Sequence, residues 1–149
     1  MRHINLLLSV TLLFFGCASS IDIVKNPNIT VKGIKKVVIL DIECGQYIDC
    51  AYSTGRLENA FLKNGIDVLD RKYFDLIVKE QGISLTGLTE EKLIEIGKMI
   101  SAQVVVTGKI TINDLTLKLI SVETGQIICN VYSQSRVERT IQKIIESLS

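Results

Sequence analysis

Histidine is almost absent from this 149-residue sequence, with His3 as its one occurrence. Catalytic triads of the Ser-His-Asp type need an imidazole, and imidazole is also the commonest zinc ligand. The chain after His3 therefore offers neither a His-dependent triad nor a histidine-ligated zinc site. An excess of charge of one sign is lacking as well, since 17 basic side chains are matched by 16 acidic ones. Without a basic cluster nothing attracts the phosphates of nucleic acid, and we expect no such partner.

Apolar runs long enough to span a membrane are also missing. The most apolar segment, residues 4–15, would cover as a helix about 18 Å of the ~30 Å hydrocarbon layer. Arg2 precedes this segment and Gly16, Cys17 and Ala18 follow it, which is the three-part pattern of an export signal. The sequence therefore predicts a signal peptide over residues 1–16 and an exported protein.

The end of this signal, Phe14-Phe15-Gly16-Cys17, resembles the lipoprotein box of bacterial lipoproteins, with Phe14 in place of the usual Leu. In that family the chain is cleaved before the cysteine, which then carries acyl chains. The resemblance implies lipidation of Cys17 and a membrane anchor, because each buried methylene contributes ~0.8 kcal/mol. Ala18 resembles the sorting pattern for the outer membrane, facing the periplasm. A secretory signal with an incidental cysteine is the alternative.

Paired C-x-x-C motifs, the usual mark of a zinc site, are absent, and we expect neither a metal nor another cofactor. Cys44 and Cys50 enclose the short stretch GQYID and could form a disulfide in an oxidising compartment. The sequence leaves the bridged and the reduced states open. Cys129 follows two isoleucines and is expected to be a small buried apolar side chain.

The hydrophobic pattern predicts one α/β domain. Residues 17–33 contain Asn26, Pro27 and Gly33 and are interpreted as the lipidated cysteine and a short linker, followed by a single domain over 34–149. We predict strands over 35–43, 66–69, 102–112, 115–122 and 127–133, and helices over 52–63, over 71–79, from 89 and from 135. The order β-α-β-α-α-β-β-β-α implies a mixed sheet of about five strands with helices packed over it.

Three segments, taken in order, resemble the CsgG-like family. They are VVILDIE at 37–43, VLDRKYFDLIVKEQGISLTGLTEE at 68–91, and AQVVVTGKI at 102–110 with LKLISVETGQI at 117–127. This family comprises curli-secretion channel subunits, LpoB-type activators of cell-wall synthases and the related amino-terminal domain of TolB. The resemblance implies their fold and a place in the bacterial envelope.

The same resemblance implies a non-enzymatic, protein-binding component of an envelope assembly or secretion complex of the curli type. Channel-forming members carry long amphipathic insertions, whereas only two residues separate Ile112 from Leu115, so we expect no pore from this chain alone. An LpoB-like regulator of a cell-envelope enzyme is the alternative. A third hypothesis, from another class, is an enzyme that uses the carboxylates near Asp41 and Glu43.

Two regions are candidate interaction surfaces. Asp41 and Glu43 follow a buried strand, where α/β sheets often bind ligands, and Tyr47 lies in the nearby loop between Cys44 and Cys50. Ile127 and Val131 lie on the last strand, which we expect to be an edge that pairs with another chain. The expected partners are an envelope protein, a second copy of the chain as a homo-oligomer, and the membrane through the lipid on Cys17.

Overall fold

The computed structural model describes residues 20–29, 33–69, 76, 79, 80, 82 and 89–148. The predicted signal peptide, Cys17 and most of the helix predicted over 71–79 lie outside these residues, although Leu76 and Lys79 are helical. No helix within the described ranges combines the length and the apolarity needed to cross a membrane.

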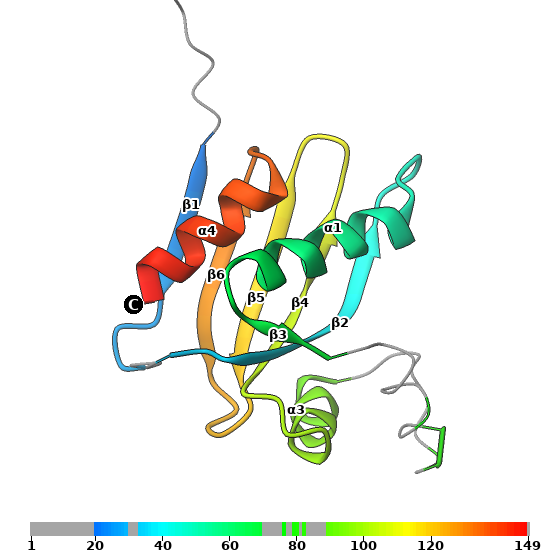
Figure 1. The fold of residues 1–149 in the computed structure, drawn as a ribbon, viewed down its shortest axis with the longest axis vertical. Helices are drawn as coiled ribbons and strands as arrows, with labels where there is room; N and C mark the ends of the chain where they lie inside the picture. The colour runs from blue at the N-terminus through cyan, green and yellow to red at the C-terminus, as the bar shows by residue number, and fades with distance from the viewer. Residues whose placement is uncertain are drawn as a thin grey trace, which may run out of the picture.

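A single mixed sheet of six strands, in the order β1-β6-β5-β4-β2-β3, forms the centre of the molecule (Figure 1). Strand β2 is parallel to β3 and β4, and the other neighbouring pairs are antiparallel. This arrangement confirms the predicted α/β class with a mixed sheet. The strands are β1 Ile21–Lys25, β2 Lys36–Cys44, β3 Asp67–Val68, β4 Val104–Ile110, β5 Leu115–Ser121 and β6 Ile127–Ser133.

Helices α1 (Cys50–Lys63) and α4 (Val137–Leu148) lie across one face of the sheet (Figure 1). Their apolar stripes are buried in the larger core cluster, because residues three and four apart share one side of a helix. The buried side chains of this stripe include Leu57 and Phe61 of α1 and Ile141 and Ile144 of α4. This face of the sheet is therefore fully covered over its central strands.

Helix α3 (Glu90–Met99) packs against the opposite face. Its Leu93 and Ile96 join Val38, Leu40 and Val105 in a second, smaller cluster near the start of β2 and β4. Thr89 caps the helix by accepting a hydrogen bond from the Lys92 backbone N–H at 3.4 Å, and a helix was predicted to begin at this residue. Because α3 is short, it covers this face only at one end of the sheet.

The predicted linker contains a sixth strand, and this corrects both the linker and the count of about five strands. Strand β1 pairs antiparallel with β6 from Ile21–Ser133 to Lys25–Cys129. Ile21 and Ile23 are half-buried against the larger core cluster, whereas Asp22 and Val24 are exposed. A run of five residues next to Pro27 carries too little periodicity to predict a strand, and β6 supplies the hydrogen bonds that make it one.

Candidate interaction surfaces

A region of the sheet next to α3, over which no described helix lies, is the first candidate surface. We call it the open face. Side chains alternate along β4, β5 and β6, so Val106, Leu117 and Val131 point into the larger core while Lys118 and Asn130 point outward. It forms a shallow groove of about 290 Å³, lined by Asp41, Glu43, Thr107, Gly108, Lys109, Thr116, Leu117, Lys118 and Asn130.

Two ion pairs hold charged side chains on the open face. Lys109 Nζ lies 3.5 Å from Glu43 Oε2, and Lys118 Nζ lies 2.5 Å from Glu90 Oε1 of α3. All four side chains are more than a third exposed, so each pair contributes at most about 1 kcal/mol to stability. Pairs this weak can exchange at little cost for charged groups of a partner protein.

A bulge in β2 turns Asp41 toward solvent. The register of β2 against β4 shifts between Ile39 and Ile42, and Asp41 adopts a φ of +52°. Bulges of this kind commonly redirect a side chain beside a functional site. The structure thus places Asp41 and Glu43 in the lining of one groove, near the end of the buried strand β2. Both are exposed, and Glu43 pairs with Lys109.

The second candidate surface lies at the end of the sheet where β2 and β4 finish, and we call it the aromatic end. Three connections meet there, namely the β2–α1 loop, the β4–β5 turn and the β6–α4 segment (Figure 1). Tyr47, Tyr52 and Ile112 are 86%, 67% and 69% exposed. A hollow of about 210 Å³ separates the connections, with Ile48, Arg56, Ile112, Asp114 and Arg136 among its lining residues.

The β2–α1 loop is held in place from both sides. Cys44 and Cys50 are joined by a disulfide, with their Cα atoms 5.6 Å apart. The Gly45 backbone N–H donates to the Ile110 carbonyl at 2.8 Å, which ties the loop to the end of β4. Asp49 then caps α1 by accepting from the Tyr52 N–H at 3.0 Å. Tyr47 is therefore presented to solvent from a fixed loop.

Hydrogen bonds also fix the β4–β5 turn. The Tyr132 hydroxyl donates to Asp114 Oδ1 at 2.7 Å, and the Gln134 amide donates to the same oxygen at 3.3 Å. This bond to Asp114 raises the pKa of Tyr132 above its ordinary value, because the neutral hydroxyl is the donor. Sequence analysis did not select Tyr52, Ile112 or Tyr132, although an isoleucine in a polar turn was a visible signal.

Ile127 and Val131 are not an exposed edge, which corrects the expectation for the last strand. Strand β1 pairs with β6 from Cys129 to Ser133, Val131 is buried in the larger core cluster, and Ile127 is half-buried. The exposed edge next to them is β1 itself, where Val24 is open to solvent. The outermost strand on this side of the sheet is β1, which belongs to the predicted linker and not to the predicted domain. Strand β6 is therefore an inner strand.

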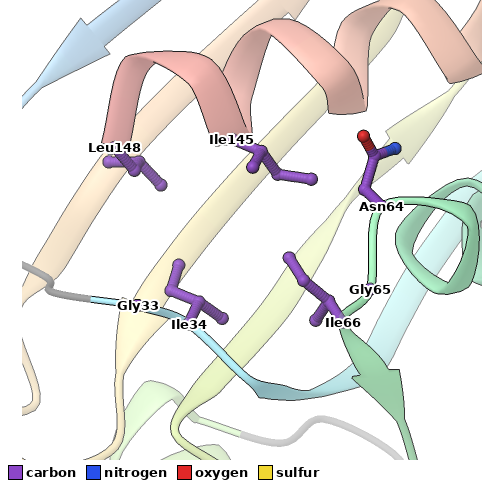
Figure 2. Close-up of a pocket in the computed structure, with 7 residues that line it drawn as sticks. All are labelled: Gly33, Ile34, Asn64, Gly65, Ile66, Ile145 and Leu148. Carbon is purple, nitrogen blue, oxygen red and sulfur yellow. The ribbon is translucent and has the colours of Figure 1, made fainter.

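A third hollow lies away from both surfaces. Figure 2 shows Ile34, Ile66, Ile145 and Leu148 pointing into it from the chain before β2, the start of β3 and the end of α4. Its volume is about 120 Å³, below the range of roughly 300–1,000 Å³ that is typical of small-molecule sites. Among the residues described by the structure, no three His, Cys, Asp or Glu side chains are grouped to hold a metal ion.

The architecture defines the class of the fold, which is that of LpoB-like domains. The chain is similar to the LpoB C-terminal domain from Escherichia coli, with a TM-score of 0.59 and 21% identity over 74% of this chain and 88% of that one. The corresponding domain from Salmonella enterica gives 0.58 and 21%, over 68% and 82%. A PelC dodecamer from Paraburkholderia phytofirmans gives 0.52 and 17%, over 87% and 96%. No family model matches the sequence, and no curated protein matches it.

Proposed function

We propose that this protein is a non-enzymatic, lipid-anchored periplasmic protein that binds and regulates an enzyme of the cell envelope. The observation that carries the proposal is the open face, an uncovered part of the sheet lined by charged and polar side chains in weak, exchangeable pairs. The likeness to LpoB domains supports the choice of an envelope enzyme as the partner. The anchor rests on the lipoprotein box at Cys17.

The proposed mechanism is local concentration followed by charge exchange. Acyl chains on Cys17 would hold the domain in a thin layer at the membrane, which raises its effective concentration for a partner in the same layer. On binding, Lys109 and Lys118 would leave Glu43 and Glu90 for carboxylates of the partner. Asp41 and Glu43 have no chemical step in this mechanism and act as contact residues.

Photocrosslinking in cells tests the open face directly. A photoreactive residue in place of Asn130 is expected to capture one defined envelope protein, because Asn130 lies within the groove. The double variant Lys109→Glu/Lys118→Glu is expected to reduce this capture at least tenfold. Lys143→Glu, an exposed position on α4 and outside the groove, is the matched control and is expected to leave it unchanged.

Regulation also requires that the activity of the captured enzyme change when this protein binds it. Added to the purified captured enzyme, the lipidated protein is expected to change its rate, and the double variant is expected to lose that effect while Lys143→Glu keeps it. Equal capture by the double variant and the parent would contradict the assignment of the open face. An unchanged rate with capture intact would contradict regulation.

A ring-forming component of a secretion or assembly complex is the second candidate. It is favoured by the likeness to the PelC dodecamer over 87% of this chain and by the exposed edge of β1. The secretion role implied by the resemblance to CsgG-like proteins belongs to this candidate. Light scattering on the lipidated protein in detergent separates the two, because a ring must appear as a closed oligomer whereas a regulator need not.

A further inference from the structure

The aromatic end is also the end at which the described chain begins. The Gln134 backbone N–H donates to the Ser20 carbonyl at 3.0 Å, and the next residue, Ile21, pairs with Ser133 at the end of β6. Ser133 pairs in turn with Leu115, the first residue of β5. The start of β1 therefore lies at the same end of the sheet as the β4–β5 turn and the β2–α1 loop, with β6 between β1 and β5 (Figure 1).

The distance to the proposed anchor is short. Cys17 precedes Ser20 by three residues, and even a fully extended chain spans only about 10 Å over that length. Acyl chains on Cys17 would enter the hydrocarbon layer, so Ser20 and the start of β1 would be confined to the vicinity of the lipid headgroups. The β4–β5 turn and the β2–α1 loop lie at this same end of the sheet. This step rests on the lipid anchor of the proposed function.

The side chains exposed at this end suit that position. Tyr47, Tyr52 and Ile112 are the three most exposed large hydrophobic side chains among the described residues, and all three belong to the loop, helix start and turn at the aromatic end. Tyrosine is enriched where membrane meets water, because its ring is apolar and its hydroxyl stays hydrated. At the opposite end, the β5–β6 turn exposes Glu123, Thr124 and Gln126.

The carboxylates at the aromatic end each have a partner within the domain. Asp49 accepts from the backbone of α1, Asp114 accepts from Tyr132, and Glu138 is paired with Arg56. Arg136 lines the hollow together with Ile48 and Ile112. A guanidinium beside apolar side chains is suited to the level of lipid phosphates, where its stem can be buried while its charge remains solvated.

We propose that the aromatic end docks on the membrane interface, with Tyr47, Tyr52 and Ile112 among the lipid headgroups. The domain then stands on the bilayer with the β2–α1 loop and the β4–β5 turn toward the lipid and α3 away from it. The open face extends from the aromatic end toward α3, so it stays accessible from the side to a partner in the same membrane.

Depth-dependent quenching tests this orientation on the full-length lipidated protein. An environment-sensitive fluorophore is attached through Ile112→Cys or, as the matched control at the opposite end, through Glu123→Cys. The added thiol is the one labelled, because Cys44 and Cys50 are bridged and Cys129 is buried. The protein is inserted into vesicles of phosphatidylethanolamine and phosphatidylglycerol that carry nitroxide-labelled headgroups.

We expect quenching at position 112 to exceed that at position 123 at least threefold, and the double variant Tyr47→Ser/Tyr52→Ser to halve the difference. Equal quenching at both positions would overturn the docking. Intact-mass analysis of the same sample distinguishes a failure of the docking from a failure of the lipid anchor. Acylated protein with equal quenching overturns the docking alone, whereas a product without acyl chains overturns the anchor of the proposed function and the docking with it.

Discussion

At the scale of single residues, Cys129 is the clearest case in which burial determines chemistry. Its side chain is fully buried in the larger core cluster, opposite Lys25 of β1. Burial raises the pKa of this thiol to about 11, because the apolar surroundings disfavour the thiolate. The thiolate is the reactive form of cysteine. We therefore expect the Cys129 thiol of the native protein to resist alkylation, because reagents cannot reach it and because it stays protonated.

We therefore expect Cys129 to react with iodoacetamide at pH 8 at least a hundredfold more slowly than a free thiol, and to reach the normal rate once urea unfolds the domain. Mass spectrometry of the alkylated peptide measures both rates. Fast labelling in the native state, before the circular dichroism signal changes, would contradict the burial of Cys129 in the larger core cluster.

At the scale of elements, close approach between β4 and β5 requires glycine at position 108. A Cβ atom there would lie 2.1 Å from the Thr116 carbonyl oxygen and 3.0 Å from the Leu117 Cα, both backbone atoms that cannot rotate away. Gly55 of α1 provides the contrast, since a Cβ at that position meets nothing within 4 Å. Two glycines in regular elements thus have different physical roles.

The substitution Gly108→Ala is expected to cost about 3 kcal/mol, because the two strands must separate locally. Gly55→Ala is expected to stabilise the domain by about 0.5–1 kcal/mol through the higher helix propensity of alanine. Urea unfolding of both variants and the parent measures these differences. Similar midpoints for Gly108→Ala and the parent would contradict the register of β4 against β5.

At the scale of the whole molecule, one ion pair joins the two helices that cover the larger core. Two of the three guanidinium nitrogens of Arg56 in α1, Nε and Nη2, donate to the Glu138 carboxylate of α4 at 2.9–3.2 Å. The pKa of Glu138 is lowered, first by a hydrogen bond from its own backbone N–H and then by Arg56. Both side chains are more than a third exposed, so solvent screens the pair.

A lowered carboxyl pKa stabilises the folded state above the pKa of the unfolded chain, about 4.3, and this contribution is lost as pH falls through the folded pKa. We expect Glu138→Gln to cost about 0.5–1 kcal/mol at pH 7 and to approach the parent at the acid end of the range. Urea midpoints measured from pH 7 to pH 3 check this. Glu123→Gln, in the exposed β5–β6 turn, is the control.

Much of this arrangement could be predicted from local pattern, and the exceptions share one cause. The strands predicted over 35–43 and 115–122 and the helix predicted from residue 89 are each present in the structure. Strand β1 escaped prediction because its five residues become a strand only when β6 lies beside them. For the same reason, the prediction that Ile127 and Val131 lie on an edge strand was wrong, because β1 lies outside β6.

The sequence by itself determined the α/β class, the order of the described elements from β2 onward and the place of Asp41 and Glu43 near a strand end, because periodicity and capping act between residues close in the chain. Only the tertiary structure decided which strand is the edge, which part of the sheet α3 leaves open, and that the start of β1, the β2–α1 loop and the β4–β5 turn lie at one end. These features depend on pairing between segments about a hundred residues apart, such as Ile21 with Ser133, and no local pattern encodes such a pairing.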